Sequence, residues 1–202
     1  GEFIGFMDHD DILAPDALFE FVLKLESDSK IDFIYTDEDK VITDSNKYFQ
    51  PHFKPDFNLD LLRSNNYICH FFAVRKTIIE QVGVLCEEYD GAQDYDFILR
   101  CTEASRKIAH IPRILYHWRI HNSSTADNPS SKLYAYEAGL HALEAHLKRM
   151  NTIGKVTMRS DYGFYDIEYP LNDTPLVSII IPNRDQSDSL IKCIDSIINK
   201  ST

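Results

Sequence analysis

The chain has 202 residues, enough for one large domain, or for one domain and a fragment of the next, with a buried core. Its 32 acidic and 21 basic side chains give a net charge of −11, which disfavours binding to nucleic-acid phosphates and anionic lipid surfaces. Hydrophobic residues make up 44% of the chain, and no apolar run approaches the roughly 20 residues that span a bilayer.

Four cysteines are spread widely along the chain: Cys69, Cys86, Cys101 and Cys193. They show neither the close pairs of a zinc site nor the density of a disulfide scaffold. We therefore expect reduced thiols and a cytoplasmic location. The sequence begins without Met and ends directly after a helix-like pattern, so we expect an excised piece of a longer protein.

The first part of the chain alternates strand-like and helix-like patterns. Residues 2–7 are mostly apolar and are followed by acids, which predicts a buried strand that delivers carboxylates into a cleft. Pro15 and the helical spacing of the apolar residues after it predict a helix that follows directly. A second strand is expected at 32–36, again followed by acids, and the proline-containing residues 43–60 predict a structured loop.

The next elements are predicted in the same way, from apolar periodicity and from the residues that break it. In chain order we expect a strand at 67–74, a short helix at 76–82 ended by Gly83, a helix at 93–103, strands at 108–111 and 114–118, a polar loop at 121–129 and a long helix at 131–150. Strands that alternate with helices predict an α/β protein built on an open mixed sheet with helices on both faces.

The composition changes after residue 151. Residues 151–174 alternate loosely and contain glycine and proline, which indicates a linker. Residues 177–181 are a continuous apolar run, typical of a strand buried on both faces of a parallel sheet, and the spacing at 190–198 predicts a helix. Residues 175–202 therefore have the pattern of one strand and one helix of a new α/β unit.

Three carboxylates follow the first predicted strand: Asp8, Asp10 and Asp11. Carboxylates at positions i and i+2 can place hard oxygen ligands on one divalent cation, and Mg or Mn prefers such ligands. The alternative is structural, with Asp11 capping the next helix and the other two acids solvated. The pattern predicts a divalent-cation site and leaves that alternative open.

Asp94 lies in the first turn of a predicted helix, three residues after Gly91. The glycine lets the backbone approach a ligand, so Asp94 is well placed to act as a general base. The alternative is that the acid only stabilises the helix dipole and cap, an effect of about 0.3–1 kcal/mol.

Residues 116–121 place two histidines, an arginine and the only tryptophan directly after a strand. The imidazole of His117 could join carboxylates on Mn, and the guanidinium of Arg119 suits a diphosphate. Histidines at strand ends are more often only packed or hydrogen-bonded, so both interpretations stay open.

In this order, the three clusters resemble the glycosyltransferase 2 family. The resemblance covers roughly residues 1–150 and rests on the segments GFMDHDD (5–11), GAQDYDFILR (91–100), and HIP (110–112) through HWR (117–119). A second segment, PLVSIIIPNRD (175–185), resembles the first strand and loop of another domain of the same family. The chain therefore resembles the C-terminal part of one domain followed by the N-terminal strand and helix of a second.

This resemblance implies a truncated GT-A fold, which is Rossmann-like, and an inverting transfer of a sugar from a nucleotide-diphosphate donor to a glycan or lipid-linked acceptor. Asp10 would bind the Mn or Mg ion that bridges the diphosphate, with His117 as a possible further ligand and Asp8 near the ribose or the metal. Asp94 would be the base that takes the proton from the acceptor hydroxyl.

The resemblance also implies that the strands holding the nucleotide base and ribose are absent ahead of Gly1. We therefore expect little or no transfer by this chain alone. A sheet without its first strands exposes an edge that invites pairing, so residues 177–199 could dock there within one chain or in a strand-swapped homodimer. The longer protein would act on lipid-linked substrates at the inner, cytoplasmic face of a membrane.

Two other classes of function remain open. The same acids could hold a cation or a sugar phosphate without turnover, in a binding or scaffold domain. A nuclease or phosphatase with a two-metal site is less well supported, because the acids lack the accompanying Lys or His cluster. Loss of donor hydrolysis on Asp94→Asn would favour the enzyme over the binding domain.

Overall fold

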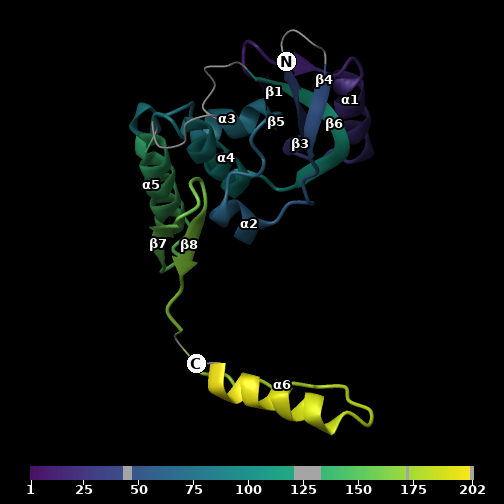
Figure 1. Ribbon diagram of the computed structural model, residues 1–202. Helices are drawn as coiled ribbons and strands as arrows, with labels where there is room; N and C mark the ends of the chain where they lie inside the picture. Colours follow the sequence, from purple (N-terminus) through teal and green to yellow (C-terminus); the bar gives the residue numbers. More distant parts are fainter. Residues whose placement is uncertain (43–46, 121–132, 172, 201–202) are drawn as a thin grey trace. The chain divides into compact units, whose positions relative to one another are not determined.

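A computed structural model of the chain describes residues 1–42, 47–120, 133–171 and 173–200 (Figure 1). The chain divides into two compact units, Gly1–Pro170 and Leu171–Thr202. Within the described residues, no helix combines the length and the apolar character needed to cross a membrane.

The first unit is built on a mixed six-stranded sheet in the order β1-β5-β3-β6-β2, with β4 paired to β3. Its strands are β1 (Phe3–Phe6), β2 (Ile12–Leu13), β3 (Phe33–Ile42), β4 (Lys47–His52), β5 (Phe72–Arg75) and β6 (Ile108–Ile120). The central pair β3 and β6 is parallel, and the other pairs are antiparallel. The prediction of an α/β protein with an open mixed sheet is confirmed.

Helices cover both faces of this sheet, because side chains of the central strand β3 alternate between two apolar clusters. Phe33 and Tyr35 belong to the larger cluster, which the sheet forms with the helices after residue 58, and Ile34 belongs to the smaller one with Phe21. The helices of this unit are α1 (Ala17–Ser27), α2 (Leu59–Ser64), α3 (Lys76–Val82), α4 (Gln93–Ala104) and α5 (Leu133–Arg149), with a short 3₁₀ turn at Glu87–Tyr89.

A hairpin of β7 (Lys155–Met158) and β8 (Tyr165–Glu168) packs beside α5 (Figure 1). Val156 and Tyr165 are buried there, and the Tyr165 hydroxyl donates to the carbonyl of Tyr136 at 2.9 Å. Much of the segment expected to be a linker is therefore part of the first unit, because its two apolar anchors bind it to α5.

Two sequence predictions differ from the structure where polar or proline residues lie inside a strand. The strand expected at 32–36 continues to Ile42 as β3, because the acids at 37–39 find partners within the sheet. The strands expected at 108–111 and 114–118 are one strand, β6, because Pro112 lies where the register against β3 shifts, and a bulge accommodates a residue without an N–H.

The sequence predictions for the remaining elements agree with the structure for two helices and differ in part for the segments at 43–60 and 67–74. The helices at 76–82 and 93–103 are confirmed as α3 and α4, and Gly83 ends α3 with a positive φ of 83°. Part of the loop expected at 43–60 is the strand β4, and the strand expected at 67–74 is reduced to β5. The polar loop expected at 121–129 lies outside the described residues.

The first strand was expected to be buried but lies at the edge of the sheet. β1 pairs with β5 on one side, and the Ile4 side chain is 38% exposed. Apolar composition alone does not distinguish an edge strand from a central one, because both carry β-branched and aromatic residues.

The second unit contains one helix, α6 (Ser187–Lys200), within the residues described there. The strand expected at 177–181 is not formed, although all five residues are described, and the Ile180 side chain is 91% exposed. An isolated apolar run has no neighbouring strand to satisfy its backbone hydrogen bonds, so it does not become a strand by itself. Pairing of this segment with the first unit, or with a second copy, stays a prediction.

Candidate active site

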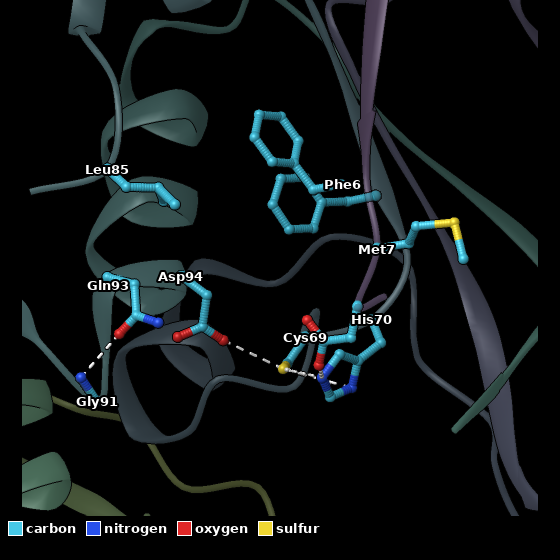
Figure 2. Close-up of a pocket in the computed structure, with 10 residues that line it drawn as sticks. Phe6, Met7, Cys69, His70, Leu85, Gly91, Gln93 and Asp94 are labelled. Atoms are coloured by element: carbon cyan, nitrogen blue, oxygen red, sulfur yellow. Dashed lines mark hydrogen bonds and ion pairs between the residues drawn. The ribbon is translucent and has the colours of Figure 1, made fainter. Parts of the chain in front are cut away.

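A pocket of about 260 Å³ opens beside the end of β1 and the start of α4. Asp8 and Asp94 both line it, although the two acids come from distant parts of the sequence. Figure 2 shows Asp94 in this pocket, facing Cys69. The other residues that line it are Phe6, Met7, Cys69, His70, Phe72, Leu85, Gly91 and Gln93. Two of the acids singled out from the sequence thus share one pocket.

Local structure fixes the position of both acids. Asp8 follows β1, and its backbone N–H donates to the Tyr116 hydroxyl at 3.2 Å. Asp94 lies in the first turn of α4, which begins two residues after Gly91. Gly91 has a φ of 91°, and a Cβ there would lie 2.7 Å from the Cβ of Ala135, so the close approach of α5 requires a glycine.

Two donors hold one oxygen of the Asp94 carboxylate. Asn66 Nδ2 donates to Oδ2 at 3.1 Å, and Cys69 Sγ donates to the same oxygen at 3.2 Å (Figure 2 shows the second bond). Burial raises the pKa of the Cys69 thiol well above its usual value, and the neighbouring Asp94 and Glu38 carboxylates raise it further. The thiol therefore stays protonated and acts as a hydrogen-bond donor.

His70 lies between two carboxylates. Its Nε2 is 3.6 Å from Asp8 Oδ2, its Nδ1 is 3.8 Å from Glu38 Oε2, and its ring stacks on Tyr116 at 5.5 Å. Burial would lower the pKa of His70, but the carboxylates of Glu38, Asp8 and Asp94 outweigh burial and raise it. The two neighbouring carboxylates therefore favour the protonated form of the His70 imidazole.

Lys54 is buried and holds the backbone that carries Cys69 and His70. Its ammonium donates to Glu38 Oε2 at 2.9 Å, to the carbonyls of Ile68 and Cys69 at 3.0 Å each, and to the carbonyl of His70. Burial lowers the pKa of Lys54, and the Glu38 carboxylate opposes that shift. This lysine thus fixes the segment on one side of the pocket.

The remaining acids after β1 hold the end of β6. Asp11 Oδ1 accepts from the backbone N–H of Arg119 at 2.7 Å, Asp11 Oδ2 accepts from the Tyr116 hydroxyl, and burial raises the pKa of Asp11. The Arg119 side chain donates through Nε to the carbonyl of Asp10 at 2.6 Å. Asp11 therefore does not cap the next helix, for which Asp16 occupies the N-cap position.

His117 lies on β6 opposite β3. Its Nδ1 is 2.6 Å from Asp39 Oδ1, which leaves Nε2 as the nitrogen available for a ligand. Within the described ranges, no three His, Cys, Asp or Glu side chains are arranged to hold a metal by themselves. The metal site expected from Asp10 and His117 therefore stays a prediction.

The structure joins four of the predicted site residues in two pairs and leaves His117 apart, hydrogen-bonded to Asp39. Asp8 and Asp94 line the pocket, whereas Asp10 and Arg119 contact each other, and neither they nor His117 is among the residues that line it. Sequence reasoning did not identify four further polar residues around the pocket: Glu38, Lys54, Asn66 and His70. The adjacent Cys69-His70 pair within an otherwise apolar run was a signal that could have identified this segment.

Comparisons with known proteins were made by sequence and by structure. No protein-family model matches the chain. The uncharacterized protein y4gI of Sinorhizobium fredii is 42% identical over 206 residues, covering 100% of this chain and 22% of that protein. The O-antigen biosynthesis protein RfbC of Myxococcus xanthus is 39% identical over 198 residues, covering 98% and 15%. The chondroitin synthase of Pasteurella multocida is 27% identical over 128 residues, covering 62% and 13%.

The chain therefore spans between 13% and 22% of the length of these curated relatives. The crystal structure of residues 1–349 of TarS from S. aureus is similar with a TM-score of 0.46 and 12% identity, covering 89% of this chain and 75% of that one. The mixed α/β architecture and the sequence similarity to the O-antigen biosynthesis protein and the chondroitin synthase support a glycosyltransferase-like fold, as the three sequence clusters indicated.

Proposed function

We propose that residues 1–150 are the metal and acceptor part of a family 2 glycosyltransferase domain and that 175–202 begin a second such domain. The reaction would be inverting transfer of a sugar from a nucleotide-diphosphate donor to a glycan or lipid-linked acceptor. The observation that supports the proposal is the shared pocket, which is lined both by Asp8 from the acidic cluster after β1 and by Asp94 from the start of α4.

Asp94 is the proposed general base. Asn66 and Cys69 both donate to Oδ2, which fixes the plane of the carboxylate and leaves Oδ1 for the proton of an acceptor hydroxyl. The protonated Cys69 thiol cannot compete as a base. A fixed carboxylate in the pocket that Asp8 also lines supports direct displacement at the anomeric carbon.

The residues that would hold the divalent ion are Asp10 and His117, with Asp8 nearby at the end of β1. When bound, Mn or Mg would neutralise negative charge on the leaving diphosphate. The Arg119 side chain, hydrogen-bonded to the Asp10 carbonyl, would add positive charge on that side, and His70, when protonated, would do so beside Asp8.

Hydrolysis of the donor tests this proposal in the longer polypeptide that contains the chain. UDP-, GDP- and dTDP-sugars are supplied singly with Mn or Mg, and the release of nucleoside diphosphate is measured. We expect release that falls by about 10²–10⁴-fold in Asp94→Asn, the usual contribution of a general base. Asp90→Asn, an exposed acid four residues earlier, is the matched control and should keep full activity.

Cation binding without any donor turnover would instead favour a binding or scaffold domain, and equal loss in both variants would contradict the role of Asp94. We further propose little transfer by the 202-residue chain alone. A cytoplasmic location, with the longer protein at the inner face of a membrane, is consistent with the four free cysteines.

A further inference from the structure

Helix α1 carries apolar side chains on two faces. Ala17 and Phe21 are buried against the sheet. The outward side of the same helix is also apolar, although the side chains there are exposed: Leu18, Phe19, Val22 and Leu23. A helix that is apolar all round is normally covered on both sides, and an exposed apolar patch of this kind marks an interaction site.

The neighbouring strand β1 has a free edge. The backbone N–H of Lys76 donates to the carbonyl of Glu2, so Glu2, and with it Ile4, directs its backbone groups toward β5. The backbone groups of Phe3 and Gly5 therefore point the other way, where no strand among the described residues pairs with them. Such an edge can accept one more strand.

The free edge of β1 and the outward apolar face of α1 form one continuous surface, which we call the α1–β1 surface. A cavity of about 300 Å³ joins the two elements, lined by Phe3 of β1 and by Val22 and Leu25 of α1. The surface therefore fits a strand that adds to the sheet together with a helix that packs beside α1.

The chain itself contains a strand-like and helical segment without partners. Residues 177–181 are mostly apolar, with Val177 and Ile180 exposed, and they form no strand. Helix α6 has apolar side chains at the spacing of a single packed face, yet none of its residues is buried: Leu190, Ile191, Ile194, Ile197 and Ile198. This segment lacks a strand edge and an apolar helix face, which are the two features of the α1–β1 surface.

The connection between the units is too short for a copy to fill its own surface. The first unit ends at Pro170, and the chain from Pro170 to Val177 spans at most about 25 Å when fully extended. The hairpin before Pro170 packs on α5, α5 packs on α4, and α4 contacts β1 through Phe97 and Phe6. These three packing steps of roughly 10 Å each exceed that reach, and the connection must pass around the helices.

We propose that the chain forms a two-fold dimer in which residues 176–200 of each copy dock on the α1–β1 surface of the other. Residues 177–181 pair with β1 through the backbone groups of Phe3 and Gly5, and α6 lays its apolar face against that of α1. Each copy gives one segment and receives one, so the assembly closes at two copies. The dimer does not depend on the proposed glycosyl transfer.

Sedimentation velocity of the 202-residue chain over a wide range of concentration tests the dimer. We expect a reversible dimer. Ile180→Asp puts a charge on the docking segment and Val22→Asp puts one on the surface, and each should raise the dissociation constant about tenfold or more, because a buried unpaired carboxylate is costly. Val84→Asp is the matched control, since Val84 is an exposed valine outside the α1–β1 surface, and it should leave the constant unchanged.

Mixing the two single variants tests the reciprocal exchange. In a mixed pair, the intact segment of the Val22→Asp copy meets the intact surface of the Ile180→Asp copy, so one of the two interfaces is restored. We expect the mixture to dimerise about tenfold more tightly than either variant alone. A dimer held by two α1 faces or by two α6 helices would show no such recovery.

Amide hydrogen exchange locates the strand pairing. The amides of Phe3 and Gly5 should exchange more slowly at concentrations where the dimer prevails, whereas that of Ile4, which is turned toward β5, should not change. A monomer at every concentration overturns the proposal, as does a mixture that dimerises no better than its parts. Exchange of Gly5 that is equally fast in monomer and dimer overturns it too, because the contact would then lie elsewhere.

Discussion

The hydroxyl of Tyr165 donates to the carbonyl of Tyr136, and the end of the Tyr165 ring lies directly against Gly139 of α5. A Cβ on Gly139 would overlap that hydroxyl and lie 3.0 Å from Cζ of the same ring. This contact helps to join the β7–β8 hairpin to α5, and both elements line a cavity of about 190 Å³ that Asp94 also lines.

Gly139→Ala should therefore destabilise the first unit, even though alanine is the better helix former. The added methyl forces the Tyr165 ring away, and overpacking of this kind costs about 1–3 kcal/mol, against a gain of up to about 1 kcal/mol in helix propensity. Urea unfolding measures the net loss. In the Tyr165→Phe background the hydroxyl is gone, so the cost of Gly139→Ala should be smaller. An equal cost in both backgrounds would show that the overlap is not its cause.

Lys54→Met should be among the most destabilising single changes in the chain. It removes the cation from a buried pair and leaves Glu38 without compensation, a type of change that costs about 3–5 kcal/mol. It also frees the carbonyls of the segment that carries Cys69 and His70. The double variant Lys54→Met with Glu38→Leu is the control, because it also removes the buried carboxylate that has lost its ammonium partner. If urea unfolding shows the double variant to be no more stable than the single one, the ion pair does not explain the loss.

Glu38 should contribute to the loss of folding stability at acid pH. Burial alone would raise the pKa of Glu38, but hydrogen bonds from His52 and His70 and the charge of Lys54 outweigh it and hold the pKa at about 2 instead of 4.5. A lowered carboxyl pKa contributes stability that is present above pH 4.5 and is lost as the pH falls toward about 2. The difference in unfolding free energy between wild type and Glu38→Gln should therefore shrink over that range. A difference independent of pH would contradict the assignment.

The thiol of Cys69 should react slowly although it lines a pocket. Burial and the nearby Asp94 raise its pKa, so little thiolate is present, whereas Cys193 is exposed. Labelling with iodoacetamide at pH 8, followed by peptide mass spectrometry, should modify Cys69 at least about tenfold more slowly than Cys193. Asp94→Asn should speed labelling of Cys69, while Asn at the exposed Asp60 should not. Equal rates for the two thiols in the wild type would be inconsistent with this environment.

The sequence predicted most of the helices, because their ends are marked locally. Gly83 ends α3, and Gly91 precedes α4, and in both cases the positive φ that the structure shows is one that glycine tolerates. Strand boundaries were harder to predict. Asp37 and Asp39 lie inside β3, and their partners, His110 and His117, come from β6, which is far away in the sequence.

The candidate site was predicted in part for the same reason. Asp8 and Asp94 each carry a local signal, a strand end and a helix start. Cys69 and His70 carry none of comparable strength, because their position depends on the buried Lys54 and on stacking against Tyr116. Residues that act through tertiary contacts of this kind are visible only once the fold is known.

Isothermal titration of UDP into the chain, with and without Mn, tests the central claim most directly. The account predicts binding that requires Mn and disappears in Asp10→Ala, while Asp60→Ala, an exposed acid distant in the sequence, binds as the wild type does. Binding that is independent of Mn and unchanged in Asp10→Ala, or no binding at all, would contradict the claim that this chain holds the metal part of a nucleotide-sugar site.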